Sequence, residues 1–270
     1  MEQNADATLR GENMKVEIIP CHFDNFSYLL VCEESGKAAI VDPAEYYPVA
    51  KVIRNLGVEL SVIYCTHHHA DHIGGLDEFC EEYPDIEVAA YGSEKNRITK
   101  MTRGLEGGET VRFGKIEGEV LHTPGHTSGC ICFRFGQHLF TGDTLFGAGC
   151  GRLFEGTPEQ MYNSLSLLVD KHTDDVKVYF GHEYTVSNLK FAQFVEPDNH
   201  EVTTRLHEAM AHLGNGGLTT PSSIGLERQT NPFLRSRVES VCKRIAKKLL
   251  IEDGNPVTVF AAIRRLKDSY

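Results

Sequence analysis

The stretch Thr66–His72 reads THHHADH, which places four histidines and one carboxylate within seven consecutive residues. It follows Ser61–Cys65, an apolar run typical of a buried strand, so the histidines begin where a strand ends. His67 and His69 are two residues apart, and in an extended segment they share one face and can bind one ion. The side chain of His68 should point the other way, so we do not expect it to be a ligand. The stretch therefore predicts a metal site.

Further ligand-type side chains follow other predicted strands. Asp71 and His72 lie just before a helix predicted near residues 74–82, which turns them toward a second point. His126, Asp143 and His182 each follow an apolar run and a glycine, which permits the turn that brings the next side chain over the end of a sheet. One tetrahedral zinc cannot use so many ligands, whereas two ions that share a carboxylate and a hydroxide can use them all. The seven candidate ligands are His67, His69, Asp71, His72, His126, Asp143 and His182.

The ligand motif resembles that of the metallo-β-lactamase superfamily. Within it, the chain from about Met14 onward is similar to the glyoxalase II, or hydroxyacylglutathione hydrolase, family. The resemblance rests on Gly149–Thr157, Gly181–Thr185, Asn188–Ala192, Glu196–Pro197, Asn231–Phe233 and Arg264–Asp268. It implies that the first metal is bound by His67, His69 and His126, the second by Asp71, His72 and His182, with Asp143 as the bridge.

The order of predicted elements favours an α+β fold of two packed sheets with helices outside. Strands are expected near 16–19, 26–32, 38–41, 61–65, 87–90, 110–113, 116–122, 129–135, 138–142 and 176–180, and helices near 47–56, 74–82 and 157–170. Only helices are expected afterwards, near 186–195, 201–213, 235–250 and 257–267, with a polar linker at 214–233. The resemblance implies the same αββα metallo-β-lactamase sandwich with a C-terminal helical domain. We expect a disordered extension (1–13), a metallo-β-lactamase domain with a dinuclear site (14–183) and a helical substrate-binding domain (184–270).

The C-terminal segment is basic in an otherwise acidic chain. Residues 235–270 carry nine Lys and Arg against four Asp and Glu, while the whole chain has a net charge of −11. Charged helix faces are usually just solvated, but the resemblance implies that Arg264 and Lys267 bind the glycine carboxylate of glutathione and that Tyr184 also contacts glutathione. Arg152 and Phe154 stand where some family members have Lys and Tyr, and Phe154 has no hydroxyl to offer to the substrate.

The function implied by this resemblance is hydrolysis of S-D-lactoylglutathione, and of related 2-hydroxyacylglutathiones, to D-lactate and glutathione. The expected nucleophile is a hydroxide that bridges two divalent ions and is held by Asp143 and the other ligands. Zinc is the expected metal, with iron or manganese as alternatives, since such ligand sets accept all three. This reaction is the second step of methylglyoxal detoxification.

Two other functions fit the metal motif. A glutathione persulfide dioxygenase of the same superfamily uses one iron but lacks the long helical tail, and a non-catalytic metal-binding module would be expected to saturate its ions with protein ligands. The acidic body argues against nucleic acid as a partner. Residues 1–13 are polar and acidic without an apolar stretch, and the eight cysteines form no CxxC pair, so we expect a cytoplasmic, reduced monomer away from membranes.

Overall fold

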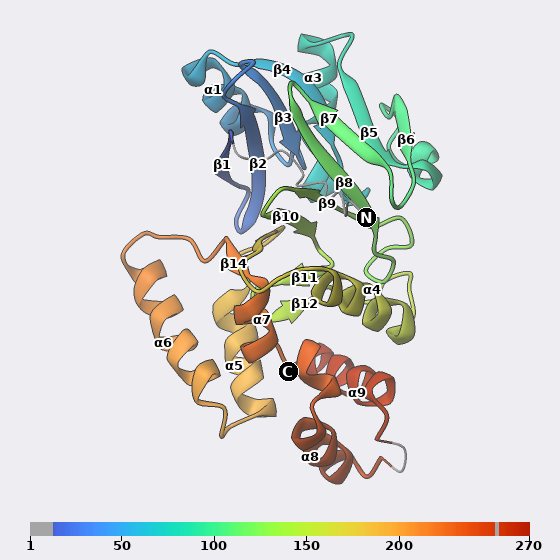
Figure 1. Ribbon diagram of the computed structural model, residues 1–270, viewed down its shortest axis with the longest axis vertical. Helices are drawn as coiled ribbons and strands as arrows, with labels where there is room; N and C mark the ends of the chain where they lie inside the picture. Colours follow the sequence, from blue (N-terminus) through green and yellow to red (C-terminus); the bar gives the residue numbers. More distant parts are fainter. Residues whose placement is uncertain (1–12, 252–253) are drawn as a thin grey trace, which may run out of the picture.

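The computed structural model describes residues 13–251 and 254–270, so the extension expected at 1–13 lies, apart from Asn13, outside the described residues. Among these residues the chain forms two six-stranded sheets (Figure 1). The first sheet contains, in spatial order, β1 (Met14–Cys21), β2 (Asn25–Cys32), β3 (Lys37–Val41), β4 (Glu59–Tyr64), β5 (Glu87–Tyr91) and β6 (Arg103–Leu105). The second contains β14 (Ser222–Ser223), β13 (Lys177–Phe180), β10 (His138–Gly142), β9 (Ile131–Phe135), β8 (Ile116–His122) and β7 (Thr110–Phe113). All ten expected strands are present.

The two sheets pack against each other through side chains that alternate along each strand. Leu30 and Ala39 belong to the core that also contains Phe133 and Phe140 of the second sheet, whereas Leu29 and its neighbours on the other face belong to a separate core. This alternation follows from the period of two in a strand, which sends successive side chains to opposite faces. Because both faces of the first sheet are covered, β2 is buried along its whole length.

Helices cover the outer faces and form the C-terminal part of the chain, as Figure 1 shows. The core on the outer face of the first sheet includes residues of α1 and α3, and α4 begins with a capping box between Thr157 and Gln160. The helices are α1 (Tyr46–Leu56), α2 (Ala70–Ile73), α3 (Leu76–Glu82), α4 (Pro158–Lys171), α5 (Thr185–Val195), α6 (His200–Gly214), α7 (Ile224–Thr230), α8 (Glu239–Leu249) and α9 (Pro256–Asp268), with 3-10 turns η1 (Gly92–Asn96) and η2 (Leu234–Arg237).

The prediction of a linker at residues 214–233 is wrong. It contains β14, which pairs antiparallel with β13, and α7, which packs beside α6. A buried polar network holds it in place: the Arg205 guanidinium donates to Glu227 Oε1 at 2.7 Å and to Ser222 Oγ at 2.9 Å, and Glu227 is 0% exposed. Polar residues that suggest a surface linker are therefore buried because they satisfy one another.

The same buried polar network also holds a short hairpin beside the ligands. This hairpin, β11 (Leu145–Phe146) with β12 (Gly149–Cys150), follows Asp143 directly and was not expected from the sequence. The Asn231 side chain donates to the carbonyl of Gly149 at 2.9 Å, and Glu227 Oε2 accepts from the backbone N–H of Ala148 at 2.8 Å. The helical part of the chain thus fixes the segment between Asp143 and Arg152.

Candidate metal centre

The seven candidate ligands meet at one end of the sandwich, where several strands finish. β3, β4 and β5 run parallel, as do β10 and β13, so the segments after these strands emerge at the same edge of their sheets. Glycine is required at two of these turns. Gly142 has a φ of 46°, and a Cβ at Gly181 would lie 2.4 Å from Asp143 Oδ1. These glycines let the backbone pass close to the ligand side chains.

His67, His69 and His126 form the first group of ligand atoms. The Nδ1 atom of His69 lies 3.1 Å from His67 Nε2 and 3.0 Å from His126 Nε2. His67 and His69 follow β4, and His126 comes from the loop between β8 and β9. Three imidazole nitrogens that converge in this way, in a buried or half-buried setting, are the donor set of a zinc-type site.

Asp71, His72 and His182 form the second group. His182 Nε2 lies 3.2 Å from His72 Nε2 and 3.3 Å from Asp71 Oδ2. Asp71 and His72 lie in the short helix α2, whereas His69, its N-cap residue, is extended. Their neighbour His68 points away from the ligand groups, with its Nδ1 2.7 Å from the buried Glu94 carboxylate, as the alternation of side chains predicts.

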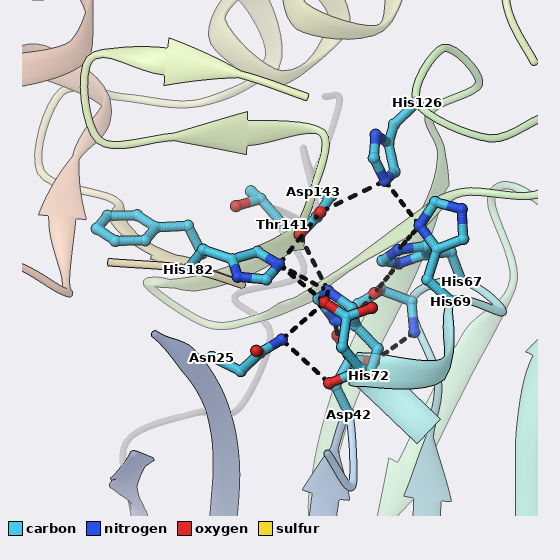
Figure 2. Close-up of polar contacts among 12 residues, drawn as sticks. Asn25, Asp42, His67, His69, His72, His126, Thr141, Asp143 and His182 are labelled. Atoms are coloured by element: carbon cyan, nitrogen blue, oxygen red, sulfur yellow. Dashed lines mark hydrogen bonds and ion pairs between the residues drawn. The ribbon is translucent and has the colours of Figure 1, made fainter. Parts of the chain in front are cut away.

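Asp143 lies between the two groups, as Figure 2 shows. Its Oδ2 is 3.4 Å from both His126 Nε2 and His182 Nε2, and its Oδ1 is 3.2 Å from His72 Nε2. Oδ1 is buried and has no hydrogen-bond partner among the described residues. A buried carboxylate oxygen without a donor is costly unless a cation neutralises it. The donor set and this oxygen together fit two metal ions that share Asp143.

The protonation tendencies of the site differ between its two halves. Burial lowers the pKa values of His67, His69 and His126, which keeps these imidazoles neutral, the form that binds metal. Burial also acts to lower the pKa of His182, but hydrogen bonds to the Asp143 and Asp71 carboxylates outweigh it and raise that pKa to about 10. Without metal, His182 therefore carries a proton at neutral pH, and its positive charge stands in for a cation beside the two carboxylates.

Each group is oriented by partners on its outer side. His72 Nδ1 and His182 Nδ1 donate to the carboxylates of Asp42 and Asp24, both at 2.9 Å, while His126 Nδ1 donates to the carbonyl of Arg152 at 2.8 Å. Asp42 also comes within ligand distance of His67 and His72, but its oxygens accept from the N–H and hydroxyl of Thr66 at 2.7 Å. It therefore orients a ligand, and such contacts hold an imidazole in the metal-binding tautomer.

Asp24→Ala should weaken the second metal site selectively. Asp24 contacts His182 and lies in the β1–β2 turn, beside Asn25, whose amide donates to Asp71 Oδ2 at 3.0 Å. Loss of a carboxylate partner of a ligating histidine costs about 10–100-fold in metal affinity. Titration with zinc in competition with a chelator should show one weakened site and one unchanged site. Asp85→Ala, which removes an exposed carboxylate, is the control, and equal weakening of both sites in Asp24→Ala would contradict the assignment.

A cavity of about 660 Å³ opens beside the metal centre and reaches to α9. All five expected substrate-binding side chains line it: Arg152, Phe154, Tyr184, Arg264 and Lys267. The Tyr184 ring stacks on His182 at 4.7 Å, and the Phe154 ring meets His126 edge-on at 5.2 Å. Aromatic side chains therefore flank both ligand groups, and the cationic side chains belong to the lining of the same cavity.

Arg264 and Lys267 lie three residues apart on α9 but differ in burial and in their polar contacts. Arg264 is only 5% exposed, and its guanidinium donates to the carbonyl of Cys150 at 3.0 Å and to Asp268 Oδ1 at 2.9 Å. Arg264 is thus a buried residue whose guanidinium also supports β12. Burial, with Arg264 and Arg152 nearby, lowers the pKa of Lys267 to about 8. Lys267 is the better probe of an anionic ligand.

Sequence reasoning missed the outer partners of the ligands and part of the cavity wall. Asp42 could have been found, since it directly follows an apolar strand as the ligands do. Asp24 lies in a hairpin turn and Asn25 begins the strand that follows, and polar residues are common at such turns for other reasons. Ser187, Asn188, Asp268 and Tyr270 also line the cavity. Asn188 and Asp268 lie in segments that carry the family resemblance, which could have singled them out, whereas nothing in the local sequence distinguishes Ser187 or Tyr270.

Comparisons with known proteins agree with this architecture. Residues 23–182 match the model of the metallo-β-lactamase superfamily, and residues 183–270 match that of the hydroxyacylglutathione hydrolase C-terminus. A protein named hydroxyacylglutathione hydrolase from Synechococcus sp. (strain JA-2-3B'a(2-13)) is 43% identical over 259 residues, which cover 95% of this chain and 100% of that protein. One of the same name from Gloeobacter violaceus is 44% identical over 92% of this chain and 96% of its own length.

Solved structures share the fold at lower identity. The crystal structure of ETHE1 from Myxococcus xanthus superposes with a TM-score of 0.64 at 24% identity, covering 94% of this chain and 99% of that one. A metallo-β-lactamase structure from Staphylococcus aureus gives 0.65 at 23% identity, over 94% of this chain and 71% of that one. At such identities the likeness concerns the fold alone. From the two matching family models and the full-length relatives, we conclude that this chain belongs to the hydroxyacylglutathione hydrolase family of the metallo-β-lactamase superfamily.

Proposed function

We propose that this protein hydrolyses the thioester bond of S-D-lactoylglutathione and related S-2-hydroxyacylglutathiones, releasing a 2-hydroxy acid and glutathione. The observation that supports this most directly is that one cavity is lined both by members of two ligand groups, with Asp143 between the groups, and by the cationic side chains of Arg152 and Lys267. A glutathione thioester has an electrophilic carbonyl and anionic carboxylates at a distance from it. The cavity offers a counterpart for each.

The ligands would hold two divalent cations, with His67, His69 and His126 on one, Asp71, His72 and His182 on the other, and Asp143 on both. Such a pair supplies hydroxide near neutral pH and polarises the carbonyl that this hydroxide attacks. The protein's own contribution is to keep the ligands in place: Asp42 and Asp24 hold His72 and His182, and the carbonyl of Arg152 holds His126. Asp143 stays ionised, since its pKa is held low by His72 and His182 against the effect of burial.

The remaining cavity residues bind and orient the substrate. Tyr184 and Phe154 place aromatic rings on either side of the ligand groups, where they restrict the thioester and limit access of bulk water. Water adds to the acyl carbon, the carbon–sulfur bond breaks, and glutathione leaves as a thiolate. Because a thiolate is a good leaving group, no strong general acid is needed, and we assign none.

The assay that tests the proposal is hydrolysis of S-D-lactoylglutathione by the purified, metal-loaded protein, followed through release of free thiol. Elemental analysis of the same sample should give two metals per chain, with zinc favoured by the histidine-rich ligands and iron or manganese as alternatives. Absence of thiol release from a sample with two metals would overturn the proposal. A single metal with full activity would overturn the dinuclear site.

The alternatives of the sequence analysis fit less well. A persulfide dioxygenase with one iron has no use for the Asp71, His72 and His182 group. A non-catalytic metal-binding module has no use for the large cavity that Asp143 and His182 line.

Among the described residues, none of the helices combines the length and apolar character that crossing a bilayer requires.

Substrate affinity should depend on pH through Lys267. Its pKa is lowered to about 8, so its positive charge is present below that pH and is lost as the pH rises through it. Because only the ammonium form attracts a carboxylate, KM for S-D-lactoylglutathione should rise above about pH 8 while kcat changes little, since this contact is remote from the reacting carbonyl.

Two substitutions separate this effect from others. Lys267→Gln should raise KM about fivefold at neutral pH, as expected for a partly exposed charge-assisted contact, and should flatten its pH dependence. Lys267→Arg should keep a low KM at pH 9, since arginine remains protonated. If KM of the wild type and of Lys267→Gln agreed at every pH, Lys267 would have no part in binding.

A further inference from the structure

A second depression lies beside Asp71. It is a groove of about 550 Å³ between the β1–β2 turn and the start of α1, and its lining includes Asn25, Ala44 and Ala70. Asp71 lines both this groove and the larger cavity. A substrate whose reacting carbonyl is placed at the ligands can therefore extend from Asp71 in two directions.

Two aromatic side chains stand exposed at the edge of the groove. Phe23 is 99% exposed and Tyr47 is 81% exposed, the highest values among the large aromatic side chains of the described residues. Exposed aromatic side chains cost free energy in water, and their presence together beside a concave surface is typical of a binding site. Neither side chain has a role in the core.

The β1–β2 turn that carries Phe23 is tied firmly to the metal centre. The adjacent Asp24 accepts from His182 Nδ1 at 2.9 Å, and Asn25 donates to both the carbonyl and Oδ2 of Asp71 at 3.0 Å. The backbone of Phe26 also donates to the carbonyl of Gly181 at 2.9 Å. The turn that carries Phe23 is thus held close to the ligands by its neighbours in sequence.

The groove and the cavity differ in charge. Arg152, Arg264 and Lys267 line the cavity, whereas the described residues that line the groove include Glu45 and Glu78 and no Lys or Arg. The peptide half of a glutathione thioester carries carboxylates, while its acyl half is uncharged in a 2-hydroxyacyl ester. Charge complementarity therefore places the peptide half in the cavity and the acyl half in the groove.

We propose that this groove is the acyl subsite, and that Phe23 and Tyr47 favour uncharged 2-hydroxyacyl groups with an apolar or aromatic substituent larger than the methyl group of lactate. The inference rests on the proposed thioesterase function and adds to it a specificity surface that has Asp71 in common with the cavity. The acidic residues Glu45 and Glu78 disfavour acyl groups that carry a free carboxylate in addition to the thioester carbonyl.

The test compares two substrates in matched variants. The ratio of kcat/KM for S-mandeloylglutathione, whose acyl group carries a phenyl ring, to that for S-D-lactoylglutathione should fall on the order of fivefold in Phe23→Ala. It should fall further in Phe23→Ala/Tyr47→Ala, and Phe23→Leu should lie between wild type and Phe23→Ala. Leu167→Ala removes an exposed apolar side chain from α4 and should leave the ratio unchanged.

A binding measurement independent of turnover completes the test. S-benzylglutathione, which is not a thioester, should compete with substrate more weakly in Phe23→Ala than in wild type, while glutathione itself should bind both equally. Unchanged ratios and unchanged S-benzylglutathione affinity in the double variant, with hydrolysis intact in the wild type, would overturn the acyl subsite alone. If the wild type hydrolysed neither ester, the proposed function would fall and the subsite with it.

Discussion

Asp143→Ala should release both metals and reduce hydrolysis of S-D-lactoylglutathione by more than about 100-fold. Even the loss of an outer partner of a metal ligand costs about 10–100-fold in metal affinity or activity, and Asp143 is itself a proposed ligand. Asp143 lies between the two ligand groups, with its oxygens 3.2–3.4 Å from His72, His126 and His182. Its removal takes a negative charge from a buried site that we propose holds two cations. Metal content by elemental analysis and thiol release by the same preparation measure the two effects.

The control is Asp85→Ala, which removes an exposed carboxylate from the segment before β5. That variant should retain two metals and wild-type turnover. Asp143→Ala protein that keeps two metals and full activity would show that the bridge lies elsewhere. Asp143→Ala protein that keeps one metal tightly would show that one ligand group binds without the shared carboxylate.

Arg205→Ala should lower the free energy of unfolding by about 3–5 kcal/mol, because it leaves a buried carboxylate without its charged partner. Glu227 is 0% exposed, and its Oε1 accepts from Arg205 at 2.7 Å and from Ser222 at 2.6 Å. For a chain of this size the loss corresponds to a melting temperature lower by roughly 10 °C. Denaturant titration and thermal melting give the two numbers.

An exposed ion pair provides the comparison. On α8, Lys243 Nζ lies 2.5 Å from Glu239 Oε1, and the two side chains are 76% and 81% exposed. Lys243→Ala should cost no more than about 0.5 kcal/mol, since solvent screens such pairs. Equal losses in Arg205→Ala and Lys243→Ala would mean that the buried network contributes nothing beyond an ordinary surface contact.

Much of the sandwich and the ligand set could be predicted from local sequence. A strand that is buried on both faces, such as β2 or β4, has a nearly continuous apolar run, and its end is visible where polar residues begin. Since parallel strands finish at the same edge, ligand-type residues after such runs are expected to meet. His67 and Asp143 are separated by 76 positions in sequence, yet the structure places them at one site for this reason.

What local sequence could not predict depends on contacts between distant segments. Ser222 and Glu227 appear as surface residues until Arg205, from another helix, is placed beside them. The burial of Arg264 depends on a carbonyl of β12, 114 residues earlier. Strands of two residues, such as β14, carry no periodicity of their own and exist because a neighbouring strand offers hydrogen bonds.

The pairing of β14 with β13 has a consequence for self-association. Without β14, the unpaired N–H and C=O groups of β13, whose buried Val178 to Phe180 are apolar, would form an open edge of the second sheet. Open apolar edges recruit strands from other molecules, and a very short edge strand offers little for them to pair with. A polypeptide that ended between His182 and Ser222 would therefore tend to aggregate through this edge, even if every metal ligand were present.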